Sequence, residues 1–310
     1  MKVEKYEIDM LGVDAADALF IRFFDDSGNY YVILVDSGRY SDGEKIYNFL
    51  TKRYNTHTID LAICTHCDED HFGGFIYLLQ QKLYAKQEYL KIQKMLINIP
   101  ENNHSVYTTQ EGNLIDLLTS VHIPYESAFS DKHALEFEGI IEIIGPTQNF
   151  YNTLVPKFKS KTLCNETLQE RNNLYSDTLG TSADSSPHNR SSIIFLFKPS
   201  DGKKFLFTGD ADLKAFENVD SSKIQNVYWL KLPHHGSGCN ISEQLINHLH
   251  PEVAYVSASK GYGQETEEKK ILNLLKAIKT NVYSTNGNTN VWHYCGTVPD
   301  REDYSQATPL

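Results

Sequence analysis

The sequence has few cysteines and no long hydrophobic run. Its 310 residues include five cysteines, three methionines and two tryptophans. The number of cysteines is odd, which favours a reduced cytoplasmic protein over a disulfide-stapled secreted one. No segment approaches the ~20 consecutive apolar residues of a membrane span, and the first 20 residues lack the apolar core of a signal peptide. We therefore expect a cytoplasmic protein that makes no contact with a membrane.

Positive charge is also in short supply. The chain has 29 Lys and Arg residues against 40 Asp and Glu residues, which gives a formal net charge of −11. Such a surface repels polyanions, so strong non-specific binding of nucleic acid is not expected. A nuclease is not excluded, because bound divalent cations would invert the sign of the charge locally. The hydrophobic content of 40% and charged content of 22% are ordinary for a globular enzyme.

Strand-like and helix-like segments alternate along the chain. Residues 18–24 and 30–36 are β-rich and separated by turn residues, which predicts a hairpin, and residues 72–84 have helical spacing. A polar segment from about 151 to 187 interrupts the pattern, and we expect a mobile excursion there. Two β-rich halves with helices between them predict a layered α/β sandwich, formed as a single domain over residues 1–310.

Four potential metal ligands follow one of the short apolar runs. In "AICTHCDEDHFGG" these are His66, Asp68, Asp70 and His71. Imidazole nitrogen and carboxylate oxygen both coordinate divalent transition metals. Alternate residues of an extended loop can point into one pocket, whereas His71, adjacent to Asp70, would diverge and serve a second position. One loop could therefore reach two metal ions.

Two later apolar runs also end in potential ligands. Asp210 follows Gly209 in "FTGDAD", and His234 and His235 lie in "LPHHGSG". Each of these alone is as compatible with a turn or surface residue as with a site. Their joint appearance, each directly after a β-like run, predicts a site at the carboxyl ends of strands, where open α/β sheets place theirs. A carboxylate such as Asp210 could bridge two metals.

These motifs resemble those of the metallo-β-lactamase superfamily. "THCDEDHFGG" looks like its H-x-H-x-D-H signature, and more narrowly like the H-x-D-x-D-H-x-G-G variant in the hydrolase domain of ComEC-type competence proteins and their free-standing relatives. Asp68 then stands in the place of the second His. "VILVDSG", "SPHNRSSIIFLF", "FLFTGDAD" and "LKLPHHGS" are similar to further motifs of the same group. The resemblance implies an αββα sandwich, with two mixed sheets and helices on the outer faces.

The resemblance also implies roles for individual residues. His66 and Asp68 would belong to the first metal position, Asp70 and His71 to the second, and Asp210 would bridge them. The implied metal ligands are His66, Asp68, Asp70, His71, His188, Asp210 and His235, and the implied catalytic residues are Asp70, Asp210, His234 and His235. The residues expected to support the ligands or touch the substrate are Asp36, Asn189, Arg190 and Ser237. For Arg190 two roles stay open, namely holding an anionic substrate and bracing the acidic site.

One segment departs from the subgroup pattern. Where relatives carry a further His in a "Y-G-H-P" segment, this chain has "GYGQETEEKK", with Gln264 and Thr266 at the expected position. Glu265 could substitute as an oxygen ligand, and His293 could fold back to compensate. The departure leaves three outcomes open: a weakly held second metal, a single-metal site, or altered chemistry.

The resemblance implies a metal-dependent hydrolase that uses one or two Zn²⁺ or Mn²⁺ ions. The subgroup favours phosphodiesters, so a nucleic acid or nucleotide substrate is expected, and the activity would be that of a phosphodiesterase or nuclease. Two other classes stay open: a hydrolase of small esters or thioesters, and a metal-binding sensor or effector module whose catalysis is impaired by the missing His. The sequence does not indicate the oligomeric state.

Overall fold

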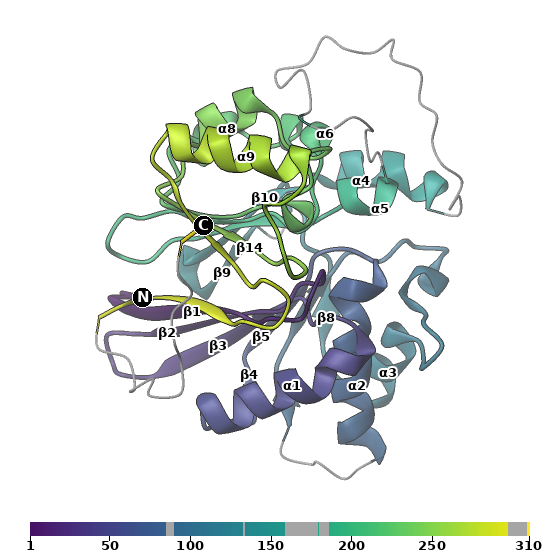
Figure 1. Ribbon diagram of the computed structural model, residues 1–310. Coiled ribbons are helices and arrows are strands. Elements are labelled where there is room, and N and C mark those ends of the chain that lie inside the picture. The colour runs from purple at the N-terminus through teal and green to yellow at the C-terminus, as the bar shows by residue number, and fades with distance from the viewer. Residues whose placement is uncertain (85–89, 133, 159–178, 180–185, 297–308) are drawn as a thin grey trace.

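The computed structural model describes residues 1–84, 90–132, 134–158, 179, 186–296 and 309–310. Two seven-stranded sheets pack face to face, and helices cover the two outer faces (Figure 1). Both sheets are mixed, with antiparallel and parallel pairs. The expected αββα sandwich is therefore confirmed. Within the described part of the chain, no helix combines the length and the apolar character needed to cross a membrane.

The first sheet is built mainly from the N-terminal half. Its strands, in spatial order, are β16 (Val291–Cys295), β1 (Lys5–Met10), β2 (Leu19–Phe24), β3 (Tyr30–Val35), β5 (Leu61–Cys64), β7 (Met95–Ile97) and β8 (Tyr125–Glu126). The helices α1 (Gly43–Asn48), α2 (Glu69–Tyr84) and α3 (Leu114–Ser120) lie on its outer face (Figure 1). A short parallel pair, β4 (Thr58–Ile59) and β6 (Lys91–Ile92), lies beside this layer. The predicted hairpin is β2 and β3, paired antiparallel.

The second sheet is built from the C-terminal half. Its strands, in spatial order, are β15 (Asn281–Ser284), β14 (Val253–Val256), β13 (Trp229–Lys231), β12 (Phe205–Phe207), β11 (Ile194–Phe197), β10 (Ile141–Gly145) and β9 (Leu135–Glu136). Its outer layer contains α6 (Leu213–Glu217), α7 (Ser221–Ile224), α8 (Glu243–Leu249) and α9 (Thr266–Ala277). The strands β12, β13, β14 and β15 run parallel, so their carboxyl ends lie at one edge of the sheet.

Aromatic side chains fill the space between the sheets. Phe195 and Phe207, a register pair on β11 and β12, stack with ring centroids 4.6 Å apart. Trp229 of β13 packs on Phe207 at 4.9 Å. All three are buried, and side chains of this size each remove a large apolar area from water. This core holds the two sheets in a fixed relation, which fixes the loops at their ends.

Two expectations about the helices need correction. The helix expected from Phe72 begins at Glu69, so Asp70 and His71 lie in its first turn and not in a loop. Acidic residues in a first turn complement the helix dipole, which accounts for the earlier start. The segment expected to be a mobile excursion begins as ordered helix, in α4 (Gln148–Leu154) and the 3₁₀ turn Val155–Lys157. Most of the remainder of that segment, residues 159–178 and 180–185, lies outside the described residues.

Candidate metal centre

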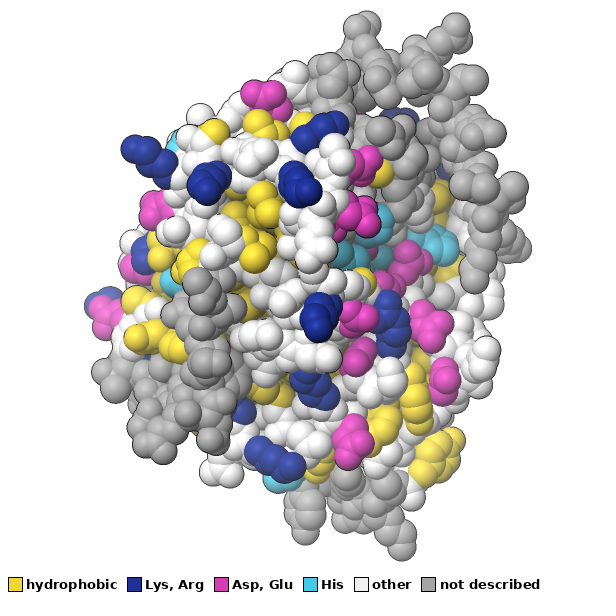
Figure 2. Space-filling view, in the orientation of Figure 1, with side chains coloured by type: hydrophobic (Ala, Val, Ile, Leu, Met, Phe, Trp, Pro, Cys, Tyr) yellow, Lys and Arg dark blue, Asp and Glu magenta, His cyan; other side chains and the backbone are white. Residues whose placement is uncertain are grey.

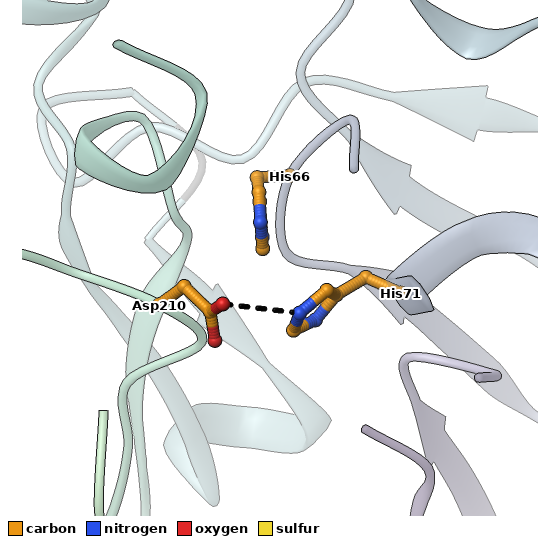
Figure 3. Close-up of side chains that lie close together, drawn as sticks. All are labelled: His66, His71 and Asp210. Carbon is orange, nitrogen blue, oxygen red and sulfur yellow. Dashed lines mark ion pairs between the residues drawn. The ribbon is translucent and has the colours of Figure 1, made fainter. Parts of the chain in front are cut away.

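The predicted ligands come together at the carboxyl ends of strands from both sheets. His66 follows β5, and His71 lies in the first turn of α2. Asp210 follows β12 of the other sheet. The His71 Nε2 atom lies 3.3 Å from Oδ2 of Asp210, and the rings of His66 and His71 are 4.1 Å apart (Figure 3). One ligand atom from each of the three residues falls within 4.8 Å of the others.

A second group of ligand atoms adjoins the first. The Nε2 atom of His235 lies 3.5 Å from Oδ2 of Asp70 and 3.7 Å from Oδ2 of Asp210. Asp70, His71 and His235 each offer one atom within 4.8 Å of the others. Because Asp210 Oδ2 faces both groups, the arrangement can accommodate two ions that share this carboxylate.

In two of the histidine rings, Nδ1 is hydrogen-bonded to a protein acceptor and this fixes the ring. Nδ1 of His71 donates to Oδ2 of Asp36 at 2.8 Å, and Nδ1 of His235 donates to the carbonyl of Ser257 at 3.0 Å. A carbonyl or ionised carboxylate can only accept, so Nδ1 carries the proton and a neutral ring keeps a lone pair on Nε2. In the neutral form of each ring, Nε2 therefore faces the site with the lone pair that coordinates a metal.

The ring of His66 is fixed by a relay through Thr65. The Thr65 hydroxyl donates to Oδ2 of Asp36 at 2.7 Å, so it can accept from Nδ1 of His66, which lies 3.1 Å away. The backbone N–H of Thr65 also donates to Asp36. Asp36, which has φ 53°, thus orients two histidines at once.

The residues fit a bound cation. The Nε2 atoms of His66, His71 and His235 are buried and find no hydrogen-bond partner among the residues that the structure describes. Buried imidazole nitrogens are normally satisfied, and a metal ion is the partner that a group of carboxylates and bare Nε2 atoms suits. The mixture of imidazole and carboxylate suits zinc and also manganese.

The charges of the cluster are strongly coupled. Burial by itself lowers the pKa of His71, but the surrounding carboxylates, Asp210 first, raise it well above its usual value. Burial raises the pKa of Asp210, but the imidazoles of His71 and His235 hold it well below its usual range. The same balance raises the pKa of His235. Without an ion, protons on these imidazoles compensate the carboxylates, so metal binding should release protons.

Residues 11–156 match the family model described as the metallo-beta-lactamase superfamily. The chain is also 23% identical over 307 residues to ComE operon protein 3 of Bacillus subtilis (strain 168). The resemblance to the metallo-β-lactamase superfamily is confirmed. The match to the Bacillus protein covers 92% of this chain but 32% of that relative, so the chain spans about a third of the relative's length.

Solved structures with a similar arrangement include two with low sequence identity. One is a crystal structure of a long form RNase Z from yeast, with a TM-score of 0.48 and 13% identity, covering 93% of this chain and 41% of that one. The other is a diphosphatase from the PhnP family, with a TM-score of 0.45 and 9% identity, covering 94% and 99%.

Beside this group of ligands, Asp68 and His188 form a pair. His188 Nδ1 lies 2.8 Å from Oδ1 of Asp68, and the other carboxylate oxygen lies 3.6 Å from Nε2 of His66. Nε2 of His188 donates to the carbonyl of Phe158 at 3.2 Å, so Nδ1 is the nitrogen that faces Asp68. Cys67, which sequence reasoning did not select, offers Sγ within 4.8 Å of the Asp68–His188 pair.

His234 lies beside the bridging carboxylate. Its Nε2 atom is 3.8 Å from Oδ2 of Asp210 and 3.4 Å from the amide nitrogen of Asn189, and its Nδ1 atom is 2.9 Å from Oδ1 of Asn240. The amide of Asn240 donates to the main-chain carbonyl of Asp210 at 3.0 Å, so its oxygen faces His234. Asn240 precedes α8, whose N-cap is Ser242.

Arg190 and Ser237, which were expected to support the ligands or touch the substrate, contact neighbouring loops. Nε of Arg190 donates to Asp212 at 2.8 Å, and Asp212 caps α6, so this buried guanidinium braces a helix and not the ligands themselves. The hydroxyl of Ser237 accepts the N–H of Cys239 at 3.3 Å, which lies in the same turn. Both side chains therefore support the loops around the site.

The segment that replaces the missing His supplies no ligand to the cluster. Glu265 is the N-cap of α9 and forms a capping box with Glu268. His293 lies on β16 among the rings of Tyr6, Phe205 and Tyr228, away from the strand-end loops. His235 instead stands next to Asp70. On the face shown in Figure 2, histidine side chains gather among acidic ones.

Two residues that were not among the expected site residues complete the surroundings. Lys231, the last residue of β13, is buried with its ammonium ion-paired to Asp17 and 3.4 Å from Oδ1 of Asp210. Burial lowers the pKa of this lysine, but the carboxylates of Asp17 and Asp210 outweigh burial, so the pKa is raised. The sequence signal for Lys231 and Asp17 was weak, because a lysine inside "WLKLP" and an aspartate inside "DAADAL" are ordinary in isolation.

Proposed function

We propose that the chain is a metal-dependent hydrolase that cleaves phosphodiester bonds, acting as one domain with two divalent ions. The observation that carries the proposal is the convergence of three bare Nε2 atoms, from His66, His71 and His235, on the carboxylates of Asp70 and Asp210. A purely structural cluster would satisfy these nitrogens with protein acceptors.

The ligands divide into two sets that share Asp210. His66 and Asp68, with His188 beside them, would hold one ion, and Asp70, His71 and His235 would hold the other. When bound, such a pair of ions lowers the pKa of a water molecule to near neutrality and offsets the charge that develops on the phosphate oxygens. Zinc and manganese are the ions proposed.

The remaining side chains position groups and handle a proton. Asn240 accepts from Nδ1 of His234, so Nε2 of His234 is the nitrogen that can exchange a proton with a bound substrate. This nitrogen lies 3.8 Å from Oδ2 of Asp210. A proton held on it would therefore lie beside the two proposed metal ions, where a leaving oxygen would need it. Asp70 and Asp210 act through their ligand positions.

The substrate class follows from the resemblance to ComEC-type domains and from the two-ion arrangement. The residues that would hold two ions around Asp210 suit displacement at phosphorus, because such ions would offset the charge that develops on the phosphate oxygens. The formal charge of −11 argues against a broad basic groove for duplex nucleic acid. A nucleotide or a single strand is therefore the proposed substrate, in the cytoplasm.

The alternatives predict different activities. A hydrolase of small esters or thioesters would act on those compounds and spare phosphodiesters. A sensor module would bind metal without turnover. Its motivation was the missing distal His, and the position of His235 next to Asp70 weighs against it.

The test is hydrolysis by protein that has been stripped of metal and reloaded with manganese or zinc. Substrates are bis-p-nitrophenyl phosphate, single- and double-stranded DNA, p-nitrophenyl acetate and a small thioester. We expect activity on the phosphodiesters that is lost in Asp210→Asn and kept in Asp220→Asn, an exposed helix cap outside the site. Equal rates for Asp210→Asn and wild type, or turnover of the esters alone, would reject the proposal.

A further inference from the structure

The two oxygens of Asp210 face different partners. Oδ2 faces the imidazoles, at 3.3 Å from Nε2 of His71, 3.7 Å from His235 and 3.8 Å from His234. Oδ1 faces the ammonium of Lys231 at 3.4 Å. The carboxylate therefore has one oxygen turned to the candidate metal pocket and one turned to a buried cation.

The ammonium of Lys231 is held from three directions. It donates to the main-chain carbonyl of Gly209 at 2.8 Å and is ion-paired with the carboxylate of Asp17, in addition to Asp210. These three oxygens match the three donors of an ammonium group. Lys231 itself is 1% exposed, so water does not compete for these contacts.

The backbone at Gly209 also fixes this geometry. Gly209 has φ 50°, and a Cβ at this position would lie 2.9 Å from side-chain atoms of Thr65 and Ser192. Its carbonyl and the side chain of the next residue, Asp210, both reach the same ammonium. The turn that presents the carboxylate and the cation that receives one of its oxygens are thus parts of one rigid arrangement.

We propose that Lys231 is a positioning residue that reserves Oδ1 of Asp210, so that the two ions share the single atom Oδ2. This inference rests on the proposed two-ion function. If Oδ1 were released, each ion could take one carboxylate oxygen, which would change how closely the ions are linked. A bystander cation would act differently, since removing a nearby positive charge only strengthens the attraction for metal ions.

The test compares Lys231→Met with Lys198→Met in the full chain stripped of metal. Both variants remove a lysine that is ion-paired with a carboxylate, but Lys198 pairs with Glu142 away from the ligands, so only the first removes the group that holds Oδ1. Manganese is titrated into each protein, free ion is measured by equilibrium dialysis, and electron paramagnetic resonance reports whether two bound ions are exchange-coupled. No substrate is needed for either measurement.

We expect wild type and Lys198→Met to bind two coupled ions with affinities within a few-fold of each other. Lys231→Met should bind the second ion at least about tenfold more weakly, equivalent to about 1.4 kcal/mol, and lose the coupled signal. Lys231→Gln, which retains an N–H donor without the charge, should recover part of the coupled signal. If circular dichroism shows that Lys231→Met does not fold, Lys231→Gln takes its place in the comparison with wild type.

Three results would overturn the proposal. These are a coupled signal and affinities in Lys231→Met that equal those of wild type, tighter binding of both ions in Lys231→Met, and equal losses in Lys231→Met and Lys198→Met. The result of this test can be distinguished from a failure of the proposed function. Coupled ions in wild type without phosphodiester turnover would reject the function alone, and turnover with an unaffected Lys231→Met would reject this inference alone.

Discussion

Asp36 provides the sharpest prediction about the ligand support, through the substitution Asp36→Asn. Oδ1 of Asp36 accepts the N–H of Thr65, and Oδ2 accepts both the Thr65 hydroxyl and Nδ1 of His71. An asparagine must place its NH₂ group against one of these donors. With the oxygen kept at the Thr65 N–H, the NH₂ group faces Nδ1 of His71, and the ring must turn to the tautomer that carries its proton on Nε2.

The size of the effect follows from that tautomer change. A proton on Nε2 occupies the lone pair that would bind the ion, and losing such a supporting contact typically costs 10–100-fold in metal affinity, or about 1.4–2.8 kcal/mol. The backbone should tolerate the change, since Asp36 has φ 53° and asparagine adopts this region readily. The effect on folding should therefore be small beside the effect on metal binding.

The assay is a zinc titration of stripped protein with a competing chelator, with unfolding of the metal-free forms measured in parallel. Asp60→Asn is the matched control, because Asp60 accepts the N–H of Val32 through Oδ2 on the same sheet and does not touch the ligands. We expect weaker zinc binding by Asp36→Asn only. Wild-type zinc affinity in Asp36→Asn would refute the proposed route from Asp36 to the metal.

Three further predictions concern stability. Burial lowers the pKa of His293 to about 4, so as the pH falls the unfolded chain binds this proton before the folded protein does. Between pH 7 and 5 wild type should therefore lose about 2 kcal/mol of unfolding free energy relative to His293→Phe. Parallel plots of unfolding free energy against pH for the two proteins would contradict this. Gly74→Ala should destabilise by about 1–3 kcal/mol in urea, because its Cβ would lie 1.9 Å from the carbonyl oxygen of Ser37, whereas Gly112→Ala, with its nearest atom at 3.4 Å, should unfold like wild type. Free zinc at 100 times its dissociation constant should stabilise the stripped protein by about 2.7 kcal/mol, and an unchanged melting temperature would argue against a folded-state metal site.

Much of the fold could be predicted from local patterns. The alternation of apolar runs with turn residues located the β2–β3 hairpin and the strands that precede His66, Asp210 and His235, because these signals are local. Strand β1 was harder to foresee, since "KYEIDM" carries two acids. Both are buried: Glu7 is ion-paired with Arg22, and Asp9 accepts from the hydroxyl of Tyr54. Tertiary partners overrode the polarity of that segment.

The contacts that orient the site could not be predicted in the same way. The partners of His235 and His234 are a carbonyl at Ser257 and an amide at Asn240, which depend on how neighbouring loops meet. No residue type at Ser257 signals the use of its main-chain oxygen. The missing distal His suggested a gap in the ligand set, but the sequence alone could not reveal that His235 approaches Asp70 from a strand end of the facing sheet.

The central claim is that the strand-end loops hold two divalent ions on either side of Asp210. Anomalous difference maps from crystals of the zinc-loaded protein, collected above and below the zinc absorption edge, test it most directly. The account predicts two peaks about 3.5–4 Å apart, with Oδ2 of Asp210 between them. A single peak, no peak, or a pair that makes no contact with Asp210 would contradict it.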